Sequence, residues 1–193
     1  MKLIVGLGNP GPEYTWSRHN VGWLLIDSFV SRADMPEPRA KFSGAFWSPS
    51  QILGGRVAFL KPFTYMNLSG KSVAEAAHYY DIPASDILVV FDDAALPFGK
   101  LRYRASGSAG GQKGMMSIIA MLGTPDIPRL RAGIDAPPPQ MDMKDWVLGR
   151  FPKEQRDDWH LVEDLAWTCL ERWMIEAGES FTAQIDGARK DKP

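Results

Sequence analysis

The chain has 193 residues, and its 22 Lys and Arg residues nearly balance 23 Asp and Glu residues, which gives a formal net charge of −1. This length fits one α/β domain with a substantial core, and the near-zero charge excludes nucleic-acid binding through the field of the whole protein, so such a contact needs a local basic patch. The only cysteine, Cys169, excludes an internal disulfide, and without a signal-peptide pattern or an apolar run near ~20 residues we expect a cytoplasmic protein with no membrane partner.

The first expected element is a buried strand over Lys2–Leu7, a short apolar run with β-branched residues. Glycines and prolines then impose an ordered loop that carries Asn9 and Tyr14. Apolar residues at helical spacing predict a helix over Arg18–Ala33, so His19 would lie near its start. In an open α/β sheet, ligands bind outside the carboxyl ends of the strands, which is where this loop lies.

Two further strands are expected over Lys41–Trp47 and Gln51–Leu60. The chain can turn between them at Ser48–Ser50, or turn later at Gly54–Gly55 within the second run. Both alternatives remain open on the sequence alone.

A loop over Lys61–Leu68 precedes a helix over Ser69–Tyr80, for which Ser69 is a suitable N-cap. The run Ile87–Phe91 is the clearest buried strand of parallel type. It delivers Asp92 and Asp93 at its carboxyl end, where functional groups collect in parallel sheets.

The alternation of basic with apolar residues over Lys100–Arg104 predicts a strand with one solvent face. A glycine-rich loop leads to an expected helix over Gly114–Leu122, and Leu130–Ile134 is expected to be a strand. Asp145–Phe151 is a compact, partly apolar segment, and Lys153–Ala177 predicts one long helix.

The alternation of strands and helices, without internal repeats or a linker, predicts a single three-layer α/β domain over residues 1–187. We expect a twisted, mixed but mostly parallel sheet flanked by helices, with residues 188–193 as a frayed tail. Cys169 lies among apolar residues of the last helix, which favours a buried, inert thiol.

Several common chemistries are disfavoured by the motifs. Gly6, Gly8 and Gly11 have the spacing of a dinucleotide fingerprint, but prolines interrupt the loop and no helix opens from the last glycine. His78 and His160 lack partners at metal-binding spacing, and no G-x-S-x-G elbow is present. We therefore expect neither a cofactor nor a metal.

His19 and Asp92 remain as a candidate pair, carried by separate elements whose ends can converge. A neutral imidazole takes a proton from water most effectively when a carboxylate holds its other ring nitrogen. Asn9 and Asn67 are amides that can position a substrate without adding charge. Each of these residues also has a local alternative role as a turn or cap residue.

A set of motifs in a fixed order extends beyond this pair. They are G-L-G-N-P-G-x-x-Y-x-x-x-R-H-N at 6–20, K-P-x-x-Y-M-N-x-S-G at 61–70, D-D with L-P-x-G at 92–99, G-S-A-G-G at 107–111, R-L-R-x-G-I at 129–134 and V-L-G-R-F at 147–151. The set covers about four-fifths of the chain and closely resembles the bacterial-type peptidyl-tRNA hydrolase family. Several motifs in order are more specific than any one alone.

The resemblance implies hydrolysis of the ester between a peptide, or N-blocked amino acid, and the 3′ ribose of tRNA, which recycles tRNA from aborted translation. By the match of motifs, His19 accepts a proton from water, Asp92 supports it, and Asn9 distinguishes blocked from free aminoacyl-tRNA. Residues that match contacts to the tRNA end or its peptide are Tyr14, Tyr65 and Asn67. Met66 would be a flexible apolar wall for peptide side chains, or an ordinary core residue.

The sequence departs from the family pattern at Gln112 and Lys113, where His-Asn is usual. Lysine supplies donors but no acceptor, so Lys113 leaves the asparagine's part in substrate binding in doubt. It can meet a phosphate or the developing oxyanion, or be a solvated surface lysine. Ala94–Ala95 replaces a stretch that often carries another acid, but Asp92 is present.

Basic residues of the second half are expected to hold RNA phosphates, which gives affinity and salt dependence rather than base specificity. They are Lys100, Arg102, Arg104, Arg129 and Arg131, with Lys113 and Arg150 nearby. The partner expected is therefore peptidyl-tRNA, bound by a monomer.

Two other functions stay open on the sequence. One is a non-catalytic RNA-binding protein of the same fold, which the intact His19, Asp92 and Asn9 set disfavours. The other is a nucleotide-cofactor enzyme, which depends only on the glycine spacing.

Overall fold

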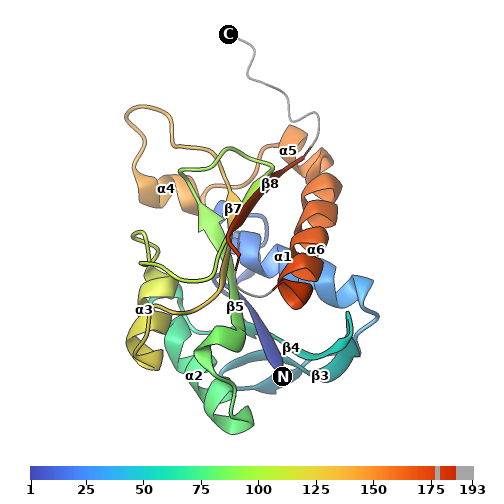
Figure 1. Ribbon diagram of the computed structural model, residues 1–193. Helices are drawn as coiled ribbons and strands as arrows, with labels where there is room; N and C mark the ends of the chain where they lie inside the picture. Colours follow the sequence, from blue (N-terminus) through green and yellow to red (C-terminus); the bar gives the residue numbers. More distant parts are fainter. Residues whose placement is uncertain (177–178, 186–193) are drawn as a thin grey trace.

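The computed structural model describes residues 1–176 and 179–185, which contain one mixed β-sheet with helices on both faces (Figure 1). The strands of these residues are β1 (Lys2–Gly6), β2 (Arg39–Lys41), β3 (Gly44–Ile52), β4 (Gly55–Pro62), β5 (Ile87–Asp93), β6 (Lys100–Arg104), β7 (Arg129–Gly133) and β8 (Phe181–Gln184). Their order in the sheet is β2-β3-β4-β1-β5-β7-β6-β8. The central strands β4, β1, β5 and β7 run parallel, and the outer pairs are antiparallel. The expected mixed α/β fold is confirmed.

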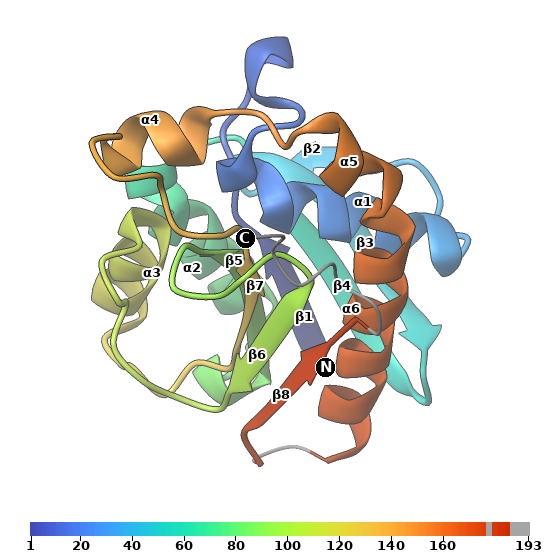
Figure 2. The same ribbon diagram turned by 90° about the horizontal axis from the view of Figure 1, so that it is seen from above.

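The helices divide between the two faces of the sheet. They are α1 (Val21–Arg32), α2 (Ser69–Tyr80), α3 (Lys113–Leu122), α4 (Met143–Leu148), α5 (Lys153–Asp157) and α6 (Trp159–Ile175), with short 3-10 turns η1 (Pro12–Tyr14), η2 (Arg18–Asn20), η3 (Met66–Leu68) and η4 (Ala84–Asp86). Helices α1 and α6 cover one face, and α2 and α3 cover the other (Figure 2). The domain is therefore three-layered.

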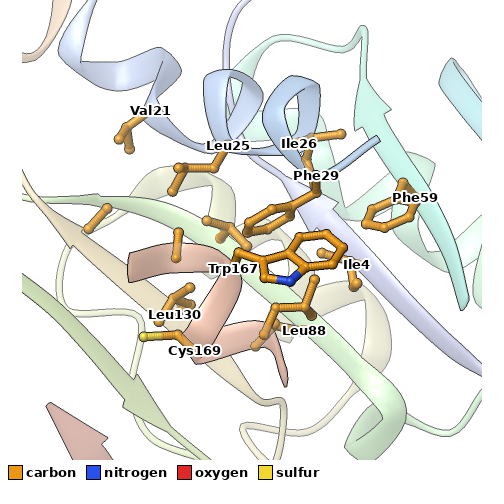
Figure 3. Packing of buried hydrophobic residues seen from close by; sticks show 14 of the residues in the cluster. Ile4, Val21, Leu25, Ile26, Phe29, Phe59, Leu88, Leu130, Trp167 and Cys169 are labelled. Atoms are coloured by element: carbon orange, nitrogen blue, oxygen red, sulfur yellow. The ribbon is translucent and has the colours of Figure 1, made fainter. Parts of the chain in front are cut away.

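Strand β1 shows how the sequence builds two cores from one sheet. Its side chains alternate, so Ile4 packs with α1 and α6 while Leu3 and Val5 pack beneath α2 and α3. Figure 3 shows the first of these cores, in which Trp167 and Cys169 of α6 meet side chains of α1 and the sheet. Burial raises the pKa of the Cys169 thiol to about 12, in keeping with the expected inert cysteine.

Two glycines let the start of α1 lie directly on the sheet. A Cβ added to Gly22 would lie 2.3 Å from the carbonyl oxygen of Val90, and one added to Gly6 would lie 2.3 Å from the carbonyl oxygen of Gly22. These distances are too short for any side chain, so glycine is required at both positions. The close approach brings η2, just before α1, to the carboxyl ends of β1 and β5.

The structure favours the later of the two alternative turns after Lys41–Trp47, and it differs from two other sequence-based expectations. The turn between β3 and β4 lies at Leu53–Gly54, where φ is 51° and 76°, whereas the Ser48–Ser50 segment lies within β3 beside a register shift. The expected helix over Lys153–Ala177 is interrupted at Asp158, where φ and ψ are −88° and 4°. After this break, the ring centroid of Trp159 lies 5.5 Å from that of Phe151. Strand β8 was not expected, and the expected tail at 188–193 lies outside the described residues.

Candidate active site

The candidate site is centred on a contact between η2 and the end of β5. Nδ1 of His19 lies 2.9 Å from Oδ2 of Asp92. The side chains of His19 and Asp92 are 14% and 5% exposed, so the pair is shielded from solvent but its imidazole is still accessible. A carboxylate accepts hydrogen bonds, so Nδ1 carries the proton and Nε2 is left with a free lone pair. The structure therefore brings together the two residues that the sequence predicted as a pair.

An asparagine pair holds the loop that precedes His19. The backbone N–H of Asn9 donates to Oδ1 of Asn20 at 2.8 Å, and Nδ2 of Asn20 donates to the carbonyl oxygen of Asn9 at 3.0 Å. Asn20 is 1% exposed. The sequence did not single out Asn20 as a site residue, although its place directly after His19 in the motif was a signal for this role.

The side chain of Asn9 has a defined orientation. Its Oδ1 accepts a hydrogen bond from the backbone N–H of Met66 at 3.2 Å. The Nδ2 group of Asn9 is consequently the end of the amide that can donate to another molecule. Met66 itself is 5% exposed and belongs to the core beneath α2 and α3, so its contact surface toward a ligand is small.

Gln112 is the second site residue that the sequence left unassigned. It is the N-cap of α3, where its Oε1 accepts from the backbone N–H of Met115 at 2.8 Å. Its Nε2 donates to Oδ1 of Asp92 at 3.2 Å and lies 3.3 Å from Sδ of Met66. The available signal was its position at the end of a glycine-rich loop, directly before a helix.

The remaining substrate-binding candidates lie on the same loops as these residues. Tyr14 is partly buried on η1, whereas Tyr65 is 66% exposed beside η3. Asn67 on η3 and Lys113 at the first turn of α3 are exposed. Within residues 1–176 and 179–185, the hydrogen bonds of the His19–Asp92 pair involve none of these four side chains.

A basic stripe lies on the neighbouring strands β6 and β7. Arg102 pairs directly with Arg131 across the two strands, and Arg104 lies two residues further along β6 on the same face. Nε of Arg131 lies 2.9 Å from Oδ2 of Asp93, the residue after Asp92. The stripe is therefore connected to the site through one strand end.

Arg129 was expected to contact RNA, and this expectation is wrong. Arg129 is 2% exposed, and its guanidinium donates to the carbonyl oxygens of Gly107, Ser108, Pro125 and Ile127. Burial and the nearby Arg131 lower the pKa of its guanidinium. Its donors hold the glycine-rich loop before α3, so they do not reach a phosphate.

Arg18 attaches the segment around α4 to η2, the turn that carries His19. Its guanidinium stacks 3.5 Å from the ring centroid of Trp146, donates to the carbonyl oxygen of Trp146 at 3.3 Å, and is buried. Its backbone N–H donates to the carbonyl oxygen of Gly149 at 2.9 Å. Burial lowers the pKa of the Arg18 guanidinium, and the nearby Asp135 opposes this effect.

Two findings concern the described part of the chain as a whole. Over residues 1–176 and 179–185, no group of three or more His, Cys, Asp or Glu side chains is placed to hold a metal ion. No helix in the same residues has the length and apolar character needed to cross a membrane.

The sheet topology and the oriented histidine define the class of protein: a three-layer α/β domain with an imidazole–carboxylate pair at the carboxyl end of a parallel strand. The family model described as Peptidyl-tRNA hydrolase matches residues 3–192, and the chain belongs to this family. The resemblance found in the sequence motifs is confirmed.

Individual relatives agree with the family model. The chain is 47% identical over 175 residues to a peptidyl-tRNA hydrolase of Bacillus cytotoxicus, covering 90% of this chain and 93% of the relative. It is 51% identical over 154 residues to one of Symbiobacterium thermophilum, covering 78% and 80%. A solved structure of peptidyl-tRNA hydrolase from Acinetobacter baumannii is similar with a TM-score of 0.82 at 32% identity, covering 89% and 87% of the two chains.

Proposed function

We infer that the chain hydrolyses the ester bond that joins a peptide, or an N-blocked amino acid, to the 3′ ribose of tRNA. The observation that carries this function is the His19–Asp92 contact of 2.9 Å at the carboxyl end of β5, in a chain of this family. A non-catalytic RNA-binding protein would have no use for an imidazole oriented in this way. We place the activity in the cytoplasm and assign it to a monomer.

In the proposed mechanism, Nε2 of His19 takes a proton from water while the water oxygen attacks the ester carbonyl carbon. Asp92 keeps the proton of His19 on Nδ1 and stabilises the imidazolium that forms. Collapse of the tetrahedral intermediate breaks the bond to the ribose oxygen, which receives the proton from His19. The products are a free peptide acid and the 3′ hydroxyl of tRNA, with no covalent enzyme intermediate. General-base catalysis of this kind contributes about 10²- to 10⁴-fold.

We assign the choice between blocked and free aminoacyl-tRNA to Asn9. Because Oδ1 of Asn9 is engaged by the N–H of Met66, its Nδ2 donates to the substrate. The amide carbonyl of a peptidyl or acetylated substrate accepts this hydrogen bond, whereas a free α-ammonium group has no acceptor. With a substrate that lacks this acceptor, the Nδ2 group of Asn9 stays buried without a hydrogen-bond partner. Such a substrate is therefore disfavoured.

The other contacts follow from position and charge. Tyr14 on η1, Tyr65 just before η3, and Met66 and Asn67 on η3 would contact the tRNA end or the peptide. Arg102, Arg104 and Arg131 would hold phosphates on the basic stripe. Lys113, which is exposed and follows Gln112, would meet a phosphate or the developing oxyanion.

The test compares hydrolysis of N-acetyl-aminoacyl-tRNA with that of free aminoacyl-tRNA by wild type and His19→Ala. We expect wild type to cleave only the blocked substrate efficiently and His19→Ala to lose about 10²- to 10⁴-fold in kcat. His160→Ala is the matched control, because His160 is exposed on α6 and should leave the rate unchanged. Equal turnover of both substrates, or full activity of His19→Ala, would refute the mechanism.

A further inference from the structure

The site contacts close into a ring that joins the loop after β1, η2, η3, the N-cap of α3 and the end of β5. In order, its members are Asn20, Asn9, Met66, Gln112, Asp92 and His19, which precedes Asn20 in the chain. Gln112 is the member contributed by α3, and it bridges Met66 on η3 to Asp92 on β5. Removing its side chain therefore opens the ring beside the catalytic pair.

The orientation of the Gln112 amide is fixed by the helix that it caps. Its Oε1 accepts from the N–H of Met115 at 2.8 Å, so only Nε2 can face Asp92. A flipped amide would place its oxygen against the carboxylate and its NH2 group against the N–H of Met115. Both contacts would be repulsive, so helix capping selects the donor that Asp92 receives.

Asp92 consequently has a donor on each carboxylate oxygen. Nε2 of Gln112 lies 3.2 Å from Oδ1, and Nδ1 of His19 lies 2.9 Å from Oδ2. The first contact holds the plane of the carboxylate so that its second oxygen faces the imidazole. The donor at Oδ1 also complements the negative charge of a carboxylate.

The charged residues on the elements around this pair are Asp93 of β5, Arg131 of β7, Arg18 of η2, Lys113 of α3, and Lys144 and Asp145 of α4. Asp93 is paired with Arg131, and Arg18 is stacked on Trp146. Gln112 contacts the carboxylate and carries no proton that titrates. Variants at position 112 share the same surrounding charges, so differences between them report on this one contact.

We propose that Gln112 is a positioning residue for the catalytic pair: its neutral amide, held by the helix cap, orients Asp92 toward His19. The proposal rests on the proposed function, since the pair is given its role there. A residue that acts through Asp92 should affect kcat and the pH profile more than KM.

Two variants separate the Asp92 contact from the helix cap. Gln112→Ser keeps a good N-cap residue but is too short to reach Asp92. Gln112→Glu keeps the shape and the cap but places a second carboxylate against Oδ1. The matched control is Gln155→Glu, because Nε2 of Gln155 donates to Oδ2 of Asp135 at 2.7 Å on α5, outside the ring.

The measurement is the pH dependence of kcat/KM on N-acetyl-aminoacyl-tRNA, with kcat and KM determined separately. We expect Gln112→Ser to lower kcat about tenfold, the loss of one hydrogen bond to a charged group, with KM changed less than about twofold. The acid limb should move to higher pH in Gln112→Ser and further in Gln112→Glu, and should stay in place in Gln155→Glu. A wild-type acid limb and kcat in both position-112 variants would overturn the proposal.

Nitrogen NMR of His19 gives a reading that does not depend on activity. Wild type should show the Nδ1–H form, and the midpoint of the His19 titration should rise in the same order as the acid limb. If wild type fails to cleave the ester while this order holds, the proposed function fails and the positioning role of Gln112 remains. If the ester is cleaved while the His19 signals are the same in all variants, the positioning role is refuted alone.

Discussion

At the scale of single residues, the site depends on amide groups whose two ends are assigned different partners. The amide oxygen of Asn9 accepts a hydrogen bond from the N–H of Met66, which leaves its NH2 group to donate to a ligand. The amide oxygen of Gln112 caps α3 by accepting from the N–H of Met115, and its NH2 group donates to Asp92. In each case, a backbone N–H fixes the orientation of a side chain that could otherwise be flipped. Local folding therefore sets the chemistry of the site.

Lys113 has a position that helix electrostatics alone would not favour. It occupies the first turn of α3, where a cation opposes the helix dipole, and the first turn carries no acidic residue. We expect Lys113→Asn to keep or raise kcat/KM on N-acetyl-aminoacyl-tRNA, because asparagine is the usual family residue. The free energy of unfolding should rise by about 0.3–1 kcal/mol as the unfavourable charge is removed. Steady-state kinetics and urea unfolding measure the two effects, and a collapse of hydrolysis would give this lysine a catalytic part of its own.

At the scale of elements, the crossing of α1 over β1 and β5 decides where His19 lies. Gly22 has no room for a side chain because the Val90 carbonyl belongs to the central sheet and has little freedom to move. We expect Gly22→Ala to destabilise the fold by about 1–3 kcal/mol and to displace η2, with a loss of activity. Gly55→Ala is the control, since its added Cβ would meet only the flexible end of Met174, at 2.7 Å. Urea unfolding measures both variants, and equal stabilities would contradict the crossing argument.

Elements with strong patterns were predictable from the sequence, and those fixed by tertiary contacts were not. The apolar run before Asp92 predicted β5 nearly at its observed bounds, and the helix expected over Ser69–Tyr80 is α2. The expected N-cap at Ser69 is wrong, because Leu68 occupies the N-cap position and Oγ of Ser69 donates to the carbonyl oxygen of Met66 at 2.9 Å. Strand β8 has only four residues and is formed by pairing with β6, so its own sequence carries little signal. The break at Asp158 accompanies the packing of Trp159 against Phe151, and this tertiary contact is not visible in the spacing of apolar residues.

The same distinction applies to the candidate site. Motif order identified His19, Asp92 and Asn9 by number, and the structure shows the contact between the first two. Gln112 and Asn20 were left out because each contacts another site residue, and such contacts depend on the folded geometry. Arg129 and Arg131 look equivalent in sequence, yet one is buried and the other lies on the open face beside Arg102.

At the scale of the whole molecule, a chain with a net charge of −1 must bind a polyanion through one region. We propose that this region is the basic stripe of β6 and β7, where Arg102 and Arg131 lie opposite each other. Directly opposed like charges cost stability in a sheet, so their placement favours a role in binding over a role in folding. Arg131 is partly neutralised by Asp93, which leaves Arg102 and Arg104 as the clearer test.

We expect Arg102→Gln and Arg104→Gln each to raise KM for N-acetyl-aminoacyl-tRNA with kcat nearly unchanged. Each phosphate contact that is lost should reduce the slope of log(kcat/KM) against log[salt] by roughly one. Arg39→Gln is the matched control, because Arg39 is exposed on β2 at the opposite end of the sheet order. Kinetics at several salt concentrations measure the slopes. The same slope in all three variants and wild type would place the tRNA on another surface, whereas a fall in kcat alone would indicate that these arginines act on the ester and not on phosphates.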